Sequence, residues 1–230
     1  NTGINPEDME SAGTHLEGLI VREYEEFPSN WRSRCDLKAF LEAHETLGVE
    51  GIDTRALTRG IRRSGAMRGI LSTETADIET LLCRVREEPG LIGRDLVKTV
   101  ACKEPYLWRN GKPGTMIAGS APSTPVTGVG SRRVIVLDCG VKYNILRHLE
   151  KRECEVFVFP ATATADQILA RRPDGVLLSN GPGDPAALPY IVRTVRTILG
   201  KVPIFGICLG HQILGQAVGG RTAKLKFGHH

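Results

Sequence analysis

Residues 203–218, PIFGICLGHQILGQAV, place a strand pattern directly before a helix pattern. The apolar run that begins the segment predicts a buried strand, and the residues after the cysteine predict a helix. Between the two, Gly206, Cys208 and Gly210 form the pattern G-x-C-x-G. This pattern is typical of a nucleophile elbow, with cysteine in the place of serine. The two glycines let the helix pack close to the strand, so the cysteine is expected on a strained turn at the edge of a sheet.

The sequence upstream of this segment alternates strand and helix patterns. The predicted strands are at 134–138, 156–160 and 175–180, and the predicted helices are at 142–152, 165–171 and 188–199. Continuously apolar strands that alternate with helices predict a parallel sheet covered on both faces. With right-handed crossovers the fold is α/β, a doubly wound and mostly parallel sheet whose functional loops follow the carboxyl ends of the strands.

A run rich in Gly, Pro, Ser and Thr interrupts the chain at 111–131. It has no apolar periodicity, and its part at 119–130 is predicted to be a linker between a first domain at 1–118 and a second at 131–230. The first domain is predicted to be smaller and of mixed α/β type. Its predicted strands are at 18–22 and 67–72, and its predicted helices are at 36–45, 53–64 and 76–87.

Composition excludes several classes of function. Hydrophobic residues make up 41% of the 230 residues and charged residues 24%, as in soluble globular proteins. The net charge of +4 comes from scattered residues and aromatics are only 5%, so no nucleic-acid partner is expected. No run of 18 apolar residues occurs, which argues against a membrane span. The sequence therefore predicts no membrane partner, and its six scattered cysteines, with nothing else that points outside the cell, favour a reduced, cytoplasmic protein.

Cysteine chemistry is expected at one position. The six cysteines are widely spaced and form no C-x-x-C pair, so neither a metal nor a redox motif is predicted. Five of them are interpreted as structural: Cys35, Cys83, Cys102, Cys139 and Cys154. Cys208 is the candidate nucleophile, since a helix N-terminus stabilises negative charge. The backbone N–H of Leu209 begins that helix and is placed to stabilise an oxyanion.

A second loop pattern follows the predicted strand at 175–180. Residues 179–185, SNGPGDP, contain two glycines beside two prolines, which fix a turn with exposed backbone N–H groups. In a parallel sheet this loop lies at the same edge as the cysteine. Such a loop can approach a ligand closely or complete an oxyanion hole, although a plain turn has the same pattern.

The two loop patterns together resemble the class I, triad-type glutamine amidotransferases. SNGPGDP followed by GICLGHQ resembles that family in order and spacing. Within it, the small subunits of carbamoyl phosphate synthetases are the most similar group. The segments that carry this closer resemblance are NPEDMES at 5–11, GIDTRALTR at 51–59, LDCGVKYNILR at 137–147 and KLKFGHH at 224–230.

The resemblance implies a glutaminase. Cys208 would attack the side-chain amide of L-glutamine and form a glutamyl thioester. The N–H groups of Gly181 and Leu209 would form the oxyanion hole. Glutamine would be bound by Gly181, Gly183, Leu209 and Gln212. The catalytic histidine and glutamate of the family fall beyond residue 230, so the resemblance implies a chain truncated at both ends. Its sheet is then incomplete, and residues 1–230 alone are predicted to hydrolyse glutamine weakly or not at all.

The resemblance also implies a partner. Ammonia would pass to the large subunit of carbamoyl phosphate synthetase, which makes carbamoyl phosphate from bicarbonate and ATP for arginine or pyrimidine biosynthesis. The sites for ATP and Mg²⁺ would belong to that subunit. No cofactor and no metal are expected in this chain, which has no phosphate-binding G-x-x-x-x-G-K-[ST] run.

Other histidines and other functions are weaker candidates. His211 is expected to pack beside the elbow rather than to reach the thiol. His229 and His230 are interpreted as native residues of the family's pattern, and not as metal ligands. Three alternatives remain open at this point. They are a different class I amidotransferase, a cysteine hydrolase acting on esters or lactones, and a non-catalytic pseudo-subunit that only binds the large subunit.

Overall fold

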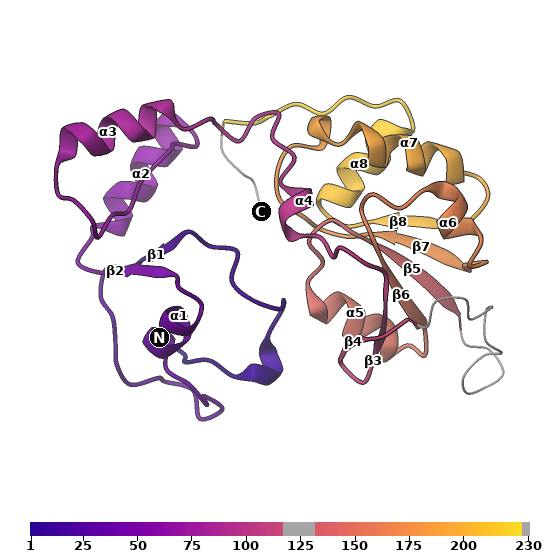
Figure 1. Cartoon of the computed structure of the whole chain (residues 1–230), viewed down its shortest axis with the longest axis horizontal. Coiled ribbons are helices and arrows are strands. Elements are labelled where there is room, and N and C mark those ends of the chain that lie inside the picture. The colour runs from indigo at the N-terminus through magenta and orange to yellow at the C-terminus, as the bar shows by residue number, and fades with distance from the viewer. Residues whose placement is uncertain (117–131, 227–230) are drawn as a thin grey trace. The chain divides into compact units, whose positions relative to one another are not determined.

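The computed structural model describes residues 1–116 and 132–226 (Figure 1). The predicted linker at 119–130 and the two histidines His229 and His230 lie outside the described residues. The chain forms two compact units. One comprises Leu91–Thr222, and the other comprises Asn1–Gly90 together with the segment that begins at Ala223.

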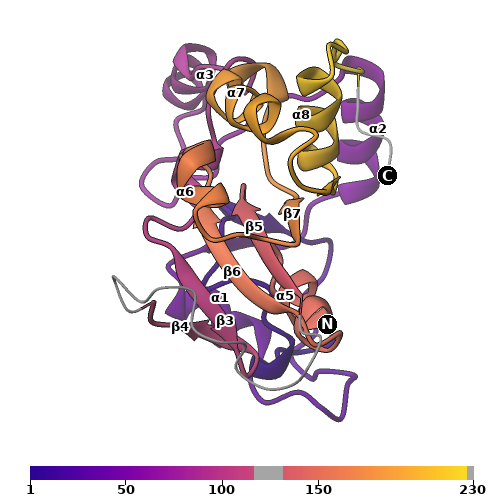
Figure 2. The same cartoon turned by 90° about the vertical axis from the view of Figure 1, so that its right-hand side faces the viewer.

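The unit Leu91–Thr222 is built on a sheet with the strand order β4-β3-β6-β5-β7-β8. Strands β5 to β8 pair in parallel, whereas β3 is antiparallel to both β4 and β6. Figure 2 shows β3, β6 and β5 side by side. The strands are β3 (Tyr106–Arg109), β4 (Lys112–Gly114), β5 (Arg133–Asp138), β6 (Glu155–Pro160), β7 (Gly175–Leu178) and β8 (Ile204–Gly206). The helices are α4 (Val97–Val100), α5 (Tyr143–Glu150), α6 (Ala165–Leu169), α7 (Pro189–Ile198) and α8 (Leu209–Ala217), with a 3-10 turn η2 at Pro185–Ala187.

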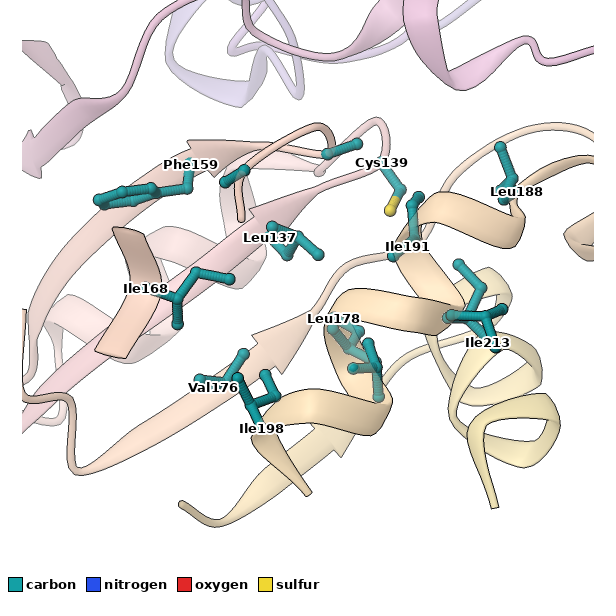
Figure 3. Close-up of a cluster of buried hydrophobic side chains, with 14 of the residues drawn as sticks. Leu137, Cys139, Phe159, Ile168, Val176, Leu178, Leu188, Ile191, Ile198 and Ile213 are labelled. Carbon is teal, nitrogen blue, oxygen red and sulfur yellow. The ribbon is translucent and has the colours of Figure 1, made fainter. Parts of the chain in front are cut away.

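Successive side chains of a strand point to opposite faces of the sheet. Apolar residues of one strand therefore belong to two clusters, and helices cover both faces. In β5, Ile135 and Leu137 belong to one hydrophobic cluster and Val136 to another, and all three are fully buried. The first cluster packs against α6, α7 and α8, whose apolar side chains are shown in Figure 3. The second packs against α5 through Leu146 and against Trp108 of β3. Figure 1 shows α6, α7 and α8 on one side of the sheet and α5 on the other.

The direction of winding changes at β5. Strand β6 lies on one side of β5 and β7 on the other. The chain leaves β5 toward α5 on one face and leaves β7 toward α7 on the opposite face. In open α/β sheets, ligands bind beyond the carboxyl ends of the strands at such a reversal. The loops that follow β5 and β7 therefore form the expected ligand site of this sheet.

The unit that contains Asn1–Gly90 has shorter elements. Its strands β1 (Gly18–Ile20) and β2 (Leu47–Val49) pair in parallel. Its helices are α1 (Leu37–Ala43), α2 (Thr54–Ser64) and α3 (Ile78–Glu87), after a 3-10 turn η1 at Pro6–Asp8. The side chains of Asp36, Asp53 and Asp77 cap the three α-helices by accepting backbone N–H groups. None of these helices contains a fully buried residue.

The predicted fold class is confirmed. The fold is α/β, with a mostly parallel sheet that has helices on both faces. A smaller mixed α/β region precedes this sheet in the chain. One predicted strand is wrong, because residues 67–72 form no strand in the structure. Among the residues that the structure describes, that short run pairs with no strand that could supply ladder hydrogen bonds.

The structure also differs from the prediction in where the chain divides. The prediction places residues 91–116 in the first domain, but β3 and β4 extend the main sheet and Trp108 is 3% exposed within its core. A strand of four residues has too little periodicity to be assigned from sequence. Within residues 1–116 and 132–226, no helix has the length and the hydropathy needed to span a bilayer.

Candidate active site

Cys208 lies on a strained turn between β8 and α8. Its backbone has φ 52° and ψ −112°, a conformation that non-glycine residues rarely adopt. The residue is exposed and directly precedes the first residue of α8. A strained backbone at the junction of a strand and a helix is the geometry of a nucleophile elbow. The structure therefore contains the turn that the pattern G-x-C-x-G predicts.

The glycines on either side of Cys208 are required by close backbone packing. A Cβ on Gly206 would lie 2.6 Å from the carbonyl carbon and oxygen of Gly210. A Cβ on Gly210 would lie 2.2 Å from the carbonyl oxygen of Leu178 in β7. Real Cβ atoms essentially never come this close to another atom, so any other residue at either position would force the backbone of the turn to shift.

The SNGPGDP loop packs against the turn that follows β5. A Cβ on Gly181 would lie 2.1 Å from the carbonyl oxygen of Cys139, so the two backbones are in direct contact. The side chain of Asn180 joins the same two loops. Its Nδ2 donates to the carbonyl oxygen of Gly140 at 2.9 Å, and its Oδ1 accepts from the N–H of Lys142 at 3.2 Å. The loop is therefore held at the reversal of the sheet.

The loop is also connected to the elbow. Strands β7 and β8 are adjacent and parallel, with Leu178 opposite Gly206. Beyond them, the N–H of Gly210 donates to the carbonyl oxygen of Ser179 at 3.1 Å, and the N–H of Ile207 donates to that of Leu178 at 3.0 Å. The elbow and the SNGPGDP loop thus begin at the same edge of the sheet, as the sequence predicts.

The predicted binding residues lie around this edge. Leu209 is 1% exposed and is the first residue of α8, so its N–H has no acceptor within the helix. Gln212 is exposed on the first turn of α8. Gly183 is exposed with φ 92°, a conformation that favours glycine. The roles assigned to Gly181, Gly183, Leu209 and Gln212 stay predictions.

The histidine nearest to Cys208 in sequence is His211. His211 is exposed on α8, three residues after Cys208. It was expected to pack beside the elbow, and its exposure shows that it is not part of the core. Among residues 1–116 and 132–226, no group of three His, Cys, Asp or Glu side chains is arranged to hold a metal ion.

Sequence reasoning missed two polar residues at this edge, Asp138 and Asn180. Asp138 is 4% exposed at the end of β5, and its carboxylate accepts three backbone N–H groups. A polar residue that ends an apolar strand at 134–138 is the signal that could have identified it. Asn180 gave no such signal, because asparagine before glycine is common in any turn.

Partly or fully buried thiols and phenols lie near the carboxylate of Asp138. Burial raises the pKa of the Cys102 thiol above its usual range, and the nearby charge of Asp138 raises it further. Burial also raises the pKa of the Tyr143 phenol, and the charge of Asp138 raises it further. Burial raises the pKa of Cys139 to about 12, with the charges of Asp138 and Asp95 contributing. These groups therefore stay protonated at neutral pH.

The different environments of Cys208 and Cys139 predict selective labelling of the cysteines. We expect iodoacetamide near neutral pH to modify Cys208 and to leave Cys139 unmodified in the folded protein, since Cys208 is exposed and Cys139 is fully buried and protonated. Peptide mass spectrometry of the labelled protein measures both. Labelling of Cys139 should begin only when denaturant unfolds the sheet. Equal rates at the two positions in the native protein would contradict this assignment of their environments.

Comparison with protein families agrees with this geometry. Residues 135–230 match the family model "Glutamine amidotransferase class-I". Residues 1–71 match the model "Carbamoyl-phosphate synthase small chain, CPSase domain". The parallel sheet, the cysteine elbow and the first of these matches together define a class I glutamine amidotransferase domain.

Curated relatives extend the match over the whole chain. It is 51% identical to the carbamoyl phosphate synthase small chain of Syntrophotalea carbinolica and 48% identical to that of Nitratidesulfovibrio vulgaris. It is 44% identical to the chloroplastic carbamoyl phosphate synthase small chain of Arabidopsis thaliana. Each match covers 100% of this chain, and 60%, 61% and 53% of the relatives in the same order. The chain belongs to the family of carbamoyl phosphate synthase small chains, and it spans a little over half the length of these relatives.

Proposed function

We propose that the protein is the glutaminase subunit of a carbamoyl phosphate synthase. The observation that carries this proposal is the left-handed backbone of Cys208, held between β8 and α8 by two glycines at which an added Cβ would clash with backbone atoms. The family matches support the same activity, because the cysteine elbow lies within the amidotransferase match and the small-chain match, residues 1–71, lies within the first unit.

The proposed reaction proceeds through a thioester. The sulfur of Cys208 attacks the side-chain amide carbon of glutamine, and the N–H groups of Leu209 and Gly181 stabilise the resulting oxyanion. The C–N bond breaks and ammonia leaves after it gains a proton. Water then cleaves the thioester, which gives glutamate and restores the thiol. Gly183 and Gln212 bind the substrate in this proposal, and the base and its carboxylate partner are residues that the family resemblance puts beyond residue 230.

The proposal includes a partner. Ammonia passes to a large subunit, which uses bicarbonate and ATP to make carbamoyl phosphate for arginine or pyrimidine biosynthesis, and the sites for ATP and Mg²⁺ belong to that subunit. The names of the relatives as small chains support a second chain. A cytoplasmic location is also proposed. It is supported by the six cysteines, none of which forms a disulfide.

The test uses the full-length gene product together with the large subunit from the same organism. We expect glutamate release from glutamine, and carbamoyl phosphate formation that depends on glutamine, bicarbonate and ATP. A complex that releases no glutamate and makes carbamoyl phosphate only from added ammonia would overturn the proposal. That result would favour the non-catalytic pseudo-subunit instead.

A further inference from the structure

The carboxylate of Asp138 connects two separate stretches of the chain at the candidate site. Its Oδ1 accepts the N–H groups of Gly140 and Val141, each at 2.8 Å, which fixes the turn after β5. Its Oδ2 accepts the N–H of Cys102, also at 2.8 Å. A carboxylate that is only 4% exposed is stable in a fold when hydrogen bonds replace its water, as these three do.

The segment that includes Cys102 packs against both loops of the site. Val97 is fully buried in the core cluster that also contains Leu137 and Leu178. A Cβ on Gly140 would lie 3.1 Å from Cγ2 of Val100, which places α4 on the turn after β5. The bond from Cys102 to Asp138 therefore ends a segment that is already packed on the core.

The same segment also reaches the SNGPGDP loop. A Cβ on Gly183 would lie 3.6 Å from the carbonyl oxygen of Arg94 and 3.6 Å from Cβ of Leu96. Residues 94–102 thus contact the loop at Gly183 and reach the turn through Asp138. The SNGPGDP loop thus contacts residues 94–102 at Gly183 and the turn after β5 at Gly181, and Asp138 bonds to both of these segments.

The position of Gly181 depends on the turn that Asp138 holds. The Gly181 backbone rests on the carbonyl of Cys139, and Asn180 bonds to both Gly140 and Lys142. The other side of this loop is tied to the elbow through the carbonyl of Ser179. The loop is therefore clamped between the turn and the elbow, and a displaced turn would move Gly181 relative to Cys208.

We propose that Asp138 is a positioning residue for the oxyanion hole: its carboxylate fixes the turn on which Gly181 rests, and so sets where the Gly181 N–H lies relative to Cys208. Asp138 does not contact the substrate in this role. The inference rests on the proposed glutaminase function, because it concerns the oxyanion of that reaction. Oxyanion donors act only within a narrow range of distance, so a small displacement lowers turnover more than substrate binding.

The test is Asp138→Asn in the full-length protein with its large subunit. The asparagine oxygen can still accept from the turn, but its NH₂ group would face the N–H of Cys102, donor against donor. We expect kcat for glutamine hydrolysis to fall about 10- to 100-fold with KM changed less than about twofold. Alkylation of Cys208 by iodoacetamide should keep its wild-type rate, because that reaction needs no oxyanion hole.

A second variant covers the case in which Asp138→Asn does not fold. Asn180→Ala removes both side-chain bonds between the loop and the turn, at a residue that is only half-buried. It leaves the carboxylate and the core intact. We expect the same loss of kcat with little change in KM, since it frees Gly181 from the turn directly.

The matched control is Glu150→Gln. Glu150 also accepts three N–H groups, those of the Trp108 ring, Asn110 and Gly111. It lies at the end of α5, near the amino ends of the parallel strands, whereas the loops of the site follow their carboxyl ends. This variant should melt at a lower temperature and keep wild-type kcat. Wild-type kcat in folded Asp138→Asn or Asn180→Ala, or an equal loss in Glu150→Gln, would overturn the positioning role alone. A wild-type complex that releases no glutamate would overturn the glutaminase function and this inference with it.

Discussion

Replacing Cys208 with serine is expected to lower glutamine hydrolysis by the full-length complex about 10⁴-fold or more. The sulfur is the attacking atom of the proposed reaction, and a serine hydroxyl at the same place is a far weaker nucleophile without its own base. Carbamoyl phosphate formation from added ammonia should continue, because the chemistry of the partner does not need the thiol. Glutamate release and carbamoyl phosphate are measured with each nitrogen source.

The control for this change is Cys83→Ser. Cys83 is the other exposed cysteine of the described residues, and it lies on α3 in the first unit. The Cys83→Ser variant should form carbamoyl phosphate at unchanged rates from glutamine and from added ammonia. If Cys208→Ser kept more than about a tenth of the glutaminase rate, Cys208 would not be the nucleophile. If both nitrogen sources failed equally, the defect would lie in assembly rather than in the thiol.

Replacing Gly210 with alanine is expected to destabilise the sheet by about 3 kcal/mol, at the upper end of the range for overpacked sites. The new Cβ would lie 2.2 Å from the carbonyl oxygen of Leu178 and 2.6 Å from its carbonyl carbon. These are backbone atoms of a central strand, so they cannot rotate away as a side chain would. The helix must shift, and the strained turn at Cys208 shifts with it. Urea unfolding of the full-length protein and its glutaminase rate measure the two effects.

The same helix offers a matched control in Gly215→Ala. Gly215 is in the interior of α8, and a Cβ there would meet no atom within 4 Å. Alanine is the better helix former, so this variant should be more stable by about 0.5–1 kcal/mol and equally active. Equal urea midpoints for Gly210→Ala and the wild type would show that the elbow does not need the close approach of α8 to β7.

Much of the second unit could be predicted because its signals are local. Apolar strands that alternate with helices are typical of a parallel sheet, and the pattern G-x-C-x-G is typical of a strained turn. The caps of the first unit are local as well, since Asp36 and Asp53 each bond a backbone N–H three residues away. Such features depend on neighbours within a few residues, and the sequence lists those neighbours directly.

The misassigned parts depend on distant partners. Strand β3 forms because β6, almost fifty residues later in sequence, supplies its ladder hydrogen bonds, and Trp108 is buried only once that pairing exists. Residues 67–72 have a similar local pattern without a partner strand, and they remain irregular. The division of the chain follows from the same pairing, which draws residues 91–116 into the second unit.

The sequence by itself determined the class of fold, the family and the cysteine at the elbow, because each is written in contiguous motifs. Only the tertiary structure showed that Asp138 accepts the N–H of Cys102, and that Gly181 rests on the carbonyl of Cys139. The physical reason is that hydrogen bonds and close backbone contacts act over about 3 Å of space. Segments that are forty residues apart come within that distance only after the sheet has formed.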